Sequence, residues 1–227
     1  MRIEEKLIEF RKRYGYLQED VAGKLEVSRQ TYMKMESGEK SVSIAQLEIL
    51  ANLYGIPVEE FMYDVQNTDK FKQMYVYFLS KFGKAGVPKT KLAKLLYLAD
   101  FRHFYDTLEP MSGVLYRCKT YGPLADSFLE ITDEMYETGA INIECLSMGA
   151  QMIALTSKPK SDAFSLLSEG ERRELDEIFE LWKDANTQVI VNYTHNQKPW
   201  MECRENEIIP YVLILQEEPD NVYTPTI

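Results

Sequence analysis

The 227-residue chain has few of the residues from which metal centres and disulfide frameworks are built. It contains three cysteines (Cys118, Cys145 and Cys203) and two histidines (His103 and His195). The cysteines are odd in number and widely spaced, and the sequence has no CxxC or HExxH motif. This pattern is typical of reduced thiols in a cytoplasmic protein, and it indicates neither a metal site nor another cofactor.

The chain also lacks a long apolar segment. No hydrophobic run is long enough to span a bilayer. The first ten residues, MRIEEKLIEF, are charged and amphipathic and do not resemble a signal peptide. We therefore expect a cytoplasmic protein that does not enter a membrane.

Positive charge is scarce, since 26 Lys and Arg stand against 36 Asp and Glu, for a formal net charge of −10. Residues 1–66 hold nine Lys and Arg and twelve Asp and Glu. This balance argues against nonspecific nucleic-acid binding, which depends on phosphate neutralisation. Residues 11–40 nevertheless hold seven basic and five acidic residues. A selective, salt-sensitive interaction with a short duplex site remains compatible with this charge.

Residues 17–38, LQEDVAGKLEVSRQTYMKMESG, have the pattern of two short helices around a tight turn. Apolar residues recur at helical spacing in both halves. Ser28 is a suitable N-cap for the second helix, and Gly38 can end it. The exposed start of the second helix would then meet base edges and phosphates in the major groove. The candidate DNA-binding residues are Gln18, Ser28, Arg29, Gln30, Thr31 and Lys34, with Arg29 and Gln30 at base edges and Gln18, Thr31 and Lys34 mainly at phosphates.

Residues 1–66 resemble the Cro/repressor (XRE-type) helix-turn-helix family. The resemblance rests on QEDVA at 18–22, VS at 27–28, ESG at 36–38 and LxxIP at 53–57. It implies a five-helix fold, with the last helix starting near Pro57, and an ion pair between Arg11 and Glu36. The chain departs from the family at Glu26, where glycine is usual. A left-handed backbone at a non-glycine residue costs about 1 kcal/mol, so we expect strain in this turn.

A polar joint at residues 67–70 separates this segment from a second region in which the hydrophobic periodicity restarts. The pattern predicts helices over 71–82 and 91–105, from Gly122-Pro123 to about Gly139, after a capping box at Ser168, and from Asn186. Residues 141–143 and 151–155 alternate as in a small hairpin. We expect a loop at 83–88, an extended segment at 113–120, an apolar helix or strand at 208–215, and a frayed end from Glu217.

Three blocks of the second region resemble the signature blocks of the Panacea, or SocA-like, antitoxin domain. They are KLAKLLYLADF at 91–101, YGP at 121–123 and THNQKPW at 194–200, and they occur in the family's order. The resemblance implies a mainly α protein, with a helix-turn-helix domain at 1–66 and a helical Panacea-like α+β domain with a small β-hairpin at 67–227. It also implies a protein toxin as partner, and it carries over no catalytic residues.

Several polar residues of the second region could be structural or functional. Asp100 lies in an apolar helical run, which predicts a buried, hydrogen-bonded acid holding the YGP loop. Tyr121, His195 and Trp200 are candidate partner contacts, although His195 could instead anchor a loop while Trp200 fills the core. Three lysines form a basic helical edge, which we interpret as a solvated face or as a surface for an acidic partner; they are Lys89, Lys91 and Lys94.

The sequence as a whole favours an antitoxin that neutralises a toxin by direct binding and represses its own operon. Its expected partners are double-stranded operator DNA, a cognate toxin and a second copy of the chain in a homodimer. The alternatives are a one-component regulator whose second domain senses a small molecule, and a proteolytic adaptor. An enzyme is disfavoured, because the sequence shows no set of nucleophile, base and orienting group.

Overall fold

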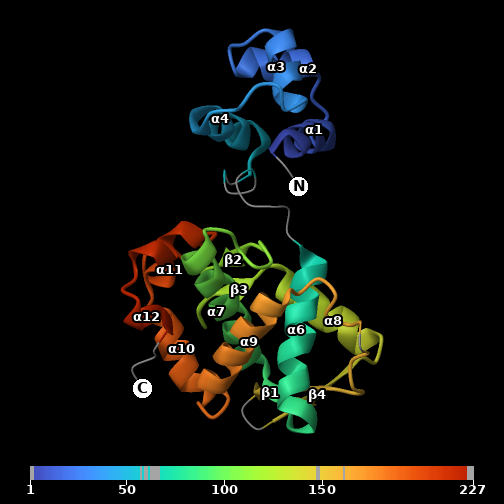
Figure 1. Ribbon diagram of the computed structural model, residues 1–227, viewed down its shortest axis with the longest axis vertical. Coiled ribbons are helices and arrows are strands. Elements are labelled where there is room, and N and C mark those ends of the chain that lie inside the picture. Colours follow the sequence, from blue (N-terminus) through green and yellow to red (C-terminus); the bar gives the residue numbers. More distant parts are fainter. Residues whose placement is uncertain are drawn as a thin grey trace. The chain divides into compact units, whose positions relative to one another are not determined.

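The computed structural model describes residues 3–56, 58, 61, 67–146, 149–160 and 162–223. The chain divides into two compact units, Met1–Val65 and Gln66–Ile227. The fold is mainly α, as predicted (Figure 1). The expected start of a fifth helix at Pro57 lies outside the described residues.

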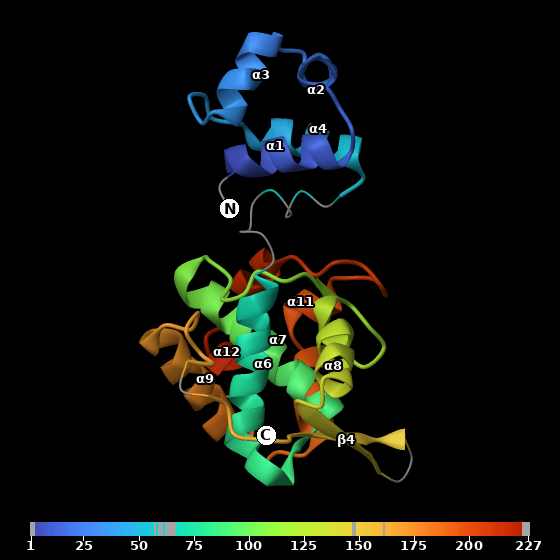
Figure 2. The same ribbon diagram turned by 90° about the vertical axis from the view of Figure 1, so that its right-hand side faces the viewer.

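The helices of the N-terminal unit are α1 (Ile3–Arg13), α2 (Gln18–Lys24), α3 (Arg29–Glu36) and α4 (Ile44–Tyr54) (Figure 2). Their apolar faces meet in one core, which includes Leu7, Phe10, Val21, Tyr32, Met35 and Leu50. The apolar residues whose helical spacing predicted the second motif helix, Tyr32 and Met35, are buried and form the inward face of α3.

The predicted N-cap at Ser28 is confirmed. Ser28 Oγ accepts the Thr31 N–H at 3.1 Å and caps α3. Ser43 and Gln46 form a reciprocal capping box at the start of α4. Glu26, between α2 and α3, has φ of 54°. The turn therefore has the left-handed backbone that we expected to be strained at a residue other than glycine.

The second unit contains α6 (Thr68–Phe82), α7 (Lys89–Thr107), α8 (Ser127–Glu137), α9 (Glu169–Trp182), α10 (Thr187–His195), α11 (Lys198–Met201) and α12 (Asp220–Tyr223), with the 3₁₀ turns η1 (Gly83–Ala85) and η3 (Tyr211–Gln216). α7 is its central helix, and α6, α9, α10 and η3 pack against it (Figure 1). Every residue from Lys91 to Phe101 is buried, because α7 is contacted on several sides. Ser168 caps α9 and Asn186 caps α10, as predicted.

A small antiparallel sheet joins β1 (Val87–Pro88), β5 (Gln151–Leu155) and β4 (Ile141–Cys145) in the order β1-β5-β4. The predicted hairpin is therefore confirmed, and β4 extends to Cys145. A second pair joins β2 (Tyr116–Arg117) and β3 (Leu124–Ala125).

Three expectations for this unit were wrong. Val87 and Pro88 form a strand instead of a loop, and β3 lies between Pro123 and the start of α8 at Ser127. Strands of two residues carry no periodicity, so only their pairing partners define them. Residues 220–223 form α12 instead of a frayed segment. Val222 is buried, and Gln197 Nε2 donates to the Asn221 carbonyl at 3.1 Å. Within the described residues, no helix is long and apolar enough to cross a membrane.

Candidate functional site

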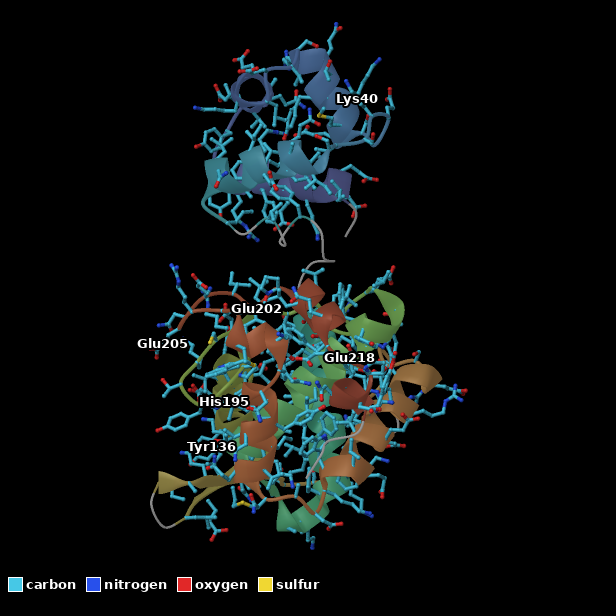
Figure 3. All side chains as sticks on the ribbon, turned by 90° about the vertical axis from the view of Figure 1, so that its left-hand side faces the viewer. Lys40, Tyr136, His195, Glu202, Glu205 and Glu218 are labelled. Carbon is cyan, nitrogen blue, oxygen red and sulfur yellow. The ribbon has the colours of Figure 1, made fainter. Side chains whose placement is uncertain are left out.

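The start of α3 forms an exposed polar surface on the N-terminal unit. Arg29, Gln30 and Lys34 are exposed, and Thr31 is half-buried beside them. The opposite face of α3 is fixed in the core, so these side chains are presented by a rigid helix. Lys40 follows α3, is exposed (Figure 3) and adds a positive charge that the motif did not single out.

A hydrogen-bonded network connects this surface to the interior of the unit. Arg11 Nε lies 2.6 Å from Glu36 Oε1, which confirms the predicted ion pair. Gln18 Nε2 donates to Glu36 Oε2 at 2.7 Å, and Arg29 donates to Gln18 Oε1 at 3.4 Å. The hydrogen bond that Arg11 donates to Glu36 raises the pKa of Arg11, so the guanidinium stays charged. The structure thus brings together Gln18 and Arg29, and gives Gln18 an internal partner that the sequence had not revealed.

Ser28 and Thr31, the other two candidates, form a second local contact. Ser28 Oγ lies 3.0 Å from Thr31 Oγ1 and also accepts the Thr31 N–H. Ser28 therefore fixes the first turn of α3. Whether any of these side chains contacts DNA remains a prediction.

In the second unit, all three of the sequence blocks singled out above meet at Gly122. Lys94 Nζ, from α7, donates to the Pro123 carbonyl at 2.6 Å. A methyl group built on Gly122 would lie 2.9 Å from Lys94 Cε and 3.0 Å from His195 Nε2. Gly122 also has φ of +91°, a backbone that side chains disfavour. Glycine is therefore required here both for its backbone and for the close approach of two side chains.

An aromatic stack completes this cluster. The rings of His195 and Trp200 lie 4.1 Å apart between centroids and 16° from parallel. Trp200 Nε1 donates to the Lys119 carbonyl at 3.3 Å. Trp200 is half-buried, so it shields His195 and does not sit deep in the core as expected. We call Lys94, Gly122, Pro123, His195 and Trp200 the Lys94 cluster.

The electrostatics of the Lys94 cluster follow from burial without an opposite charge. The Lys94 residue is 2% exposed, and burial lowers the pKa of its amine to about 7. Burial, and then the neighbouring Lys94, lower the pKa of His195. In the described part of the chain, His195 Nε2 is buried and has no hydrogen-bond partner. The cluster therefore holds two basic groups that both favour their neutral forms.

The interpretation of the lysines as a solvated edge is wrong for Lys91 and Lys94. Both are buried, and Lys89 is half-buried. Lys91 Nζ donates to the carbonyl oxygens of Lys183, at 2.9 Å, and Ala185, at 2.5 Å, just after α9. Carbonyl oxygens thus accept hydrogen bonds from both buried amines.

Asp100 is a buried, hydrogen-bonded acid, as predicted, but it holds a different segment. It accepts the Ser112 N–H and the Ser112 hydroxyl, both at 2.6 Å, and the Tyr116 hydroxyl at 2.8 Å. Burial raises its pKa to about 6 against the opposing effect of these bonds. The YGP loop is instead held by Lys94.

Tyr121 extends the Lys94 cluster toward solvent, since it adjoins Gly122 and is 75% exposed. Thr120, just before it, bonds to Glu205 at 2.9 Å. Figure 3 shows Glu202, Glu205 and His195 on the α10–α11 side of this unit. Glu202 and Glu205 are exposed on this surface, as is Arg204 between them, and sequence reasoning had singled out none of the three.

The described residues contain no group of His, Cys, Asp and Glu that could hold a metal ion. The three cysteines are free thiols.

Two family models match the chain. Residues 92–201 match the antitoxin SocA-like, Panacea domain, and residues 7–61 match a helix-turn-helix domain. The chain is a Panacea-domain protein with an N-terminal helix-turn-helix domain. The Panacea match includes the Lys94 cluster, and the helix-turn-helix match includes α3 with its exposed start. Families of these two kinds are not typically enzymatic. No curated protein and no solved structure matches the chain significantly.

Proposed function

We propose that this Panacea-domain protein is an antitoxin that neutralises a protein toxin by direct binding and represses its own operon. The observation that carries the proposal is the union, in one chain, of an antitoxin-like domain and a helix-turn-helix domain with an exposed polar α3 start. The proposal assigns operator binding to residues 1–66 and toxin binding to residues 67–227. If toxin binding and DNA binding are coupled, each must change the affinity for the other by the same factor.

In the operator complex, we assign base contacts to Arg29 and Gln30 and phosphate contacts mainly to Gln18, Thr31 and Lys34. Alanine at Arg29 or Gln30 should cost about 1–3 kcal/mol of operator binding if the base contact is bidentate. Lys34→Ala should weaken binding to all sequences alike and flatten the salt dependence. Mobility shifts on the chain's own promoter, at several salt concentrations, measure both effects. Unchanged binding by the Arg29/Gln30 double variant would exclude this assignment.

For the toxin, we propose the surface formed by Tyr121, His195 and Trp200. Tyr121 offers a large exposed ring, and the His195–Trp200 stack supports the adjoining loop. Tyr121→Ala should reduce growth rescue when the neighbouring toxin is co-expressed. Tyr136→Ala, which removes another exposed tyrosine from α8, is the matched control and should keep full rescue. Equal rescue by both variants would place the toxin elsewhere.

Co-expression of separate fragments tests the division of labour. Residues 67–227 should rescue growth without binding the operator. Residues 1–66 should bind DNA only weakly, because a single half-site contact lacks the advantage of two tethered heads. Rescue by the small fragment alone would move toxin binding to the helix-turn-helix domain.

Two alternatives are separated when the amount of toxin in the cells of the growth assay is measured by immunoblot. A proteolytic adaptor would lower the amount of toxin in the cell, whereas direct masking leaves the toxin present in a complex. If no adjacent gene is toxic, a ligand-sensing regulator becomes the better proposal. The unpartnered His195 Nε2 beside the buried Lys94 favours that alternative, because convergent buried polar groups are what a ligand site requires.

A further inference from the structure

The two edges of the three-stranded sheet differ in how well they are protected. The β1 edge has only two residues, one of them Pro88, which has no N–H to offer. β1 is also contacted by α7. The opposite edge is β4, five residues long and without proline. β4 lies in a hairpin that projects beyond α8 (Figure 2).

The hydrogen bonds that bracket the hairpin define which backbone groups of β4 point outward. Leu146 N–H donates to the Ala150 carbonyl at 2.7 Å, and Thr156 N–H donates to the Ala140 carbonyl at 3.1 Å. Bonded and non-bonded pairs alternate along an antiparallel ladder. Even-numbered residues of β4 therefore bond to β5, while the N–H and C=O groups of the odd-numbered residues point away from it. Because β4 is the last strand in the sheet, these groups face the outer edge.

We propose that β4 pairs antiparallel with β4 of a second copy of this chain, centred on Ile143. This pairing rests on the proposed function, because it supplies the dimer that binding to a palindromic operator requires. Ile143 would lie opposite Ile143 of the second copy, and Ile141 opposite Cys145. The outward N–H and C=O groups of all three residues then form hydrogen bonds with the second copy. The result is a continuous six-stranded sheet with no open β4 edge.

The side chains of β4 suit this pairing with themselves. Ile141, Ile143 and Cys145 share one face, so the apolar line continues across the two-fold axis. On the other face, exposed Asn142 would lie opposite Glu144, and no two like charges are opposed. A contact centred on one residue is isologous and closes after two copies. A second copy therefore fits this edge better than a partner strand of unrelated sequence.

Additional apolar surface lies beside this edge. Tyr136, near the end of α8, is 55% exposed, and α8 leads directly into β4 (Figure 3). Leu146, which follows β4, is 43% exposed. These side chains offer burial to a dimer beyond the backbone hydrogen bonds alone.

Disulfide trapping tests the register in the full-length protein. Asn142→Cys and Glu144→Cys are prepared as separate proteins, each with Cys145→Ser, then mixed and oxidised mildly. Residues 142 and 144 would form a directly opposed, non-hydrogen-bonded pair, with Cα atoms about 4.5 Å apart, within disulfide reach. Residue 142 of one chain would lie diagonally from residue 142 of the other, about 7–8 Å away. We therefore expect a cross-linked dimer in the mixture and little or none in either protein alone.

A proline variant gives an independent measurement. Ile143→Pro removes an outward N–H while leaving the bonds of β4 to β5 in place. Size-exclusion chromatography with light scattering should show the mass falling from two chains to one. Ile143→Val is the matched control and should remain dimeric, and circular dichroism verifies that both variants fold.

The outcomes decide between occupants of the edge. Equal cross-linking in the mixture and in the single proteins overturns the register, and no cross-linking in the mixture overturns the pairing. A monomeric free protein, in which Ile143→Pro alone abolishes growth rescue, would show that the edge takes a toxin strand instead. Growth rescue by the unaltered chain does not depend on this edge pairing with itself, so it tests the proposed function separately.

Discussion

Glu36 of the N-terminal unit is buried in a pair with Arg11, whereas Lys94 and Asp100 of the second unit are buried against neutral groups. Arg11 and Glu36 meet in a salt bridge, and Gln18 satisfies a further oxygen of the carboxylate. Lys94 instead bonds to one carbonyl oxygen, and Asp100 accepts hydrogen bonds from a backbone amide and two hydroxyl groups.

This difference determines how each unit responds to pH. The hydrogen bond to Glu36 outweighs desolvation at Arg11, so the pKa of Arg11 is raised. Neutral partners compensate less, so burial moves the pKa of Lys94 down to about 7 and that of Asp100 up to about 6. We therefore expect Lys94 and Asp100 to make the stability of the second unit depend on pH near neutrality.

The largest effect is expected where the buried pair is broken. Arg11→Ala leaves Glu36 buried without its cation, which typically costs about 3–5 kcal/mol. The exposed pair of Arg13 and Glu9 is the control, and Arg13→Ala should cost about 0.3–0.5 kcal/mol. Thermal and denaturant unfolding of the N-terminal unit measure both. An Arg11→Ala protein with wild-type melting and lost operator binding would show that Arg11 acts on DNA.

Gly122→Ala tests how tightly the Lys94 cluster is packed. The new methyl group would meet Lys94 and His195 at 3.0 Å or less, on a backbone with φ of +91°. Gly139→Ala is the matched control, because Gly139 has φ of +71° but nothing within 4 Å of a new Cβ. The control should cost about 1–2 kcal/mol from the backbone, and Gly122→Ala about 1–3 kcal/mol more from overpacking. Equal losses of stability in the two variants would mean that Lys94 and His195 move aside at no cost.

The pH dependence of the second unit should trace to Lys94. Its pKa is about 7 when folded and near 10.5 when unfolded, so between these values the unfolded chain binds more protons. Stability should therefore rise with pH above about 7, by at most about 1.4 kcal/mol per pH unit. Denaturant unfolding from about pH 6 to about pH 9 compares wild type with Lys94→Met, which should lose this slope. Lys89→Met should keep it, and a retained slope in Lys94→Met would assign the titration to another group.

The smallest effect concerns the link between the buried pair and the DNA surface. Gln18→Ala removes one hydrogen bond to Glu36 while Arg11 remains, so it should cost about 0.5–1.5 kcal/mol of stability. It should also weaken operator binding, because Arg29 loses its bond to Gln18. Gln30→Ala, at an exposed position, should weaken binding with no loss of stability. If the two variants melt alike, the network does not support the N-terminal unit.

Local chemistry explains why most helices could be predicted from the sequence. Ser28, Ser43 and Ser168 are followed by residues that complete their caps, and these signals lie within four residues of chain. The helix-turn-helix motif and the Arg11–Glu36 pair could also be predicted, because both belong to a family pattern of fixed spacing. The Lys94 cluster could be predicted only in part. Its three blocks were visible, but their meeting at Gly122 was not.

The sequence by itself determined the capped starts of α3 and α9, the inward face of α3 and the resemblance of both regions to their families, since short-range caps, periodic apolar residues and ordered motifs encode them. Only the tertiary structure decided that Lys91 and Lys94 are buried, that Asp100 holds Ser112 and Tyr116, and that β1 pairs with β5. Each of these depends on a partner far along the chain: Lys94 and Pro123 are 29 residues apart, and Lys91 and Ala185 are 94 apart. The residues that flank a lysine in a helical sequence do not distinguish an amine that lies in water from one that bonds to a carbonyl oxygen. The free energy of burial depends on the packed surroundings, which the local pattern does not contain.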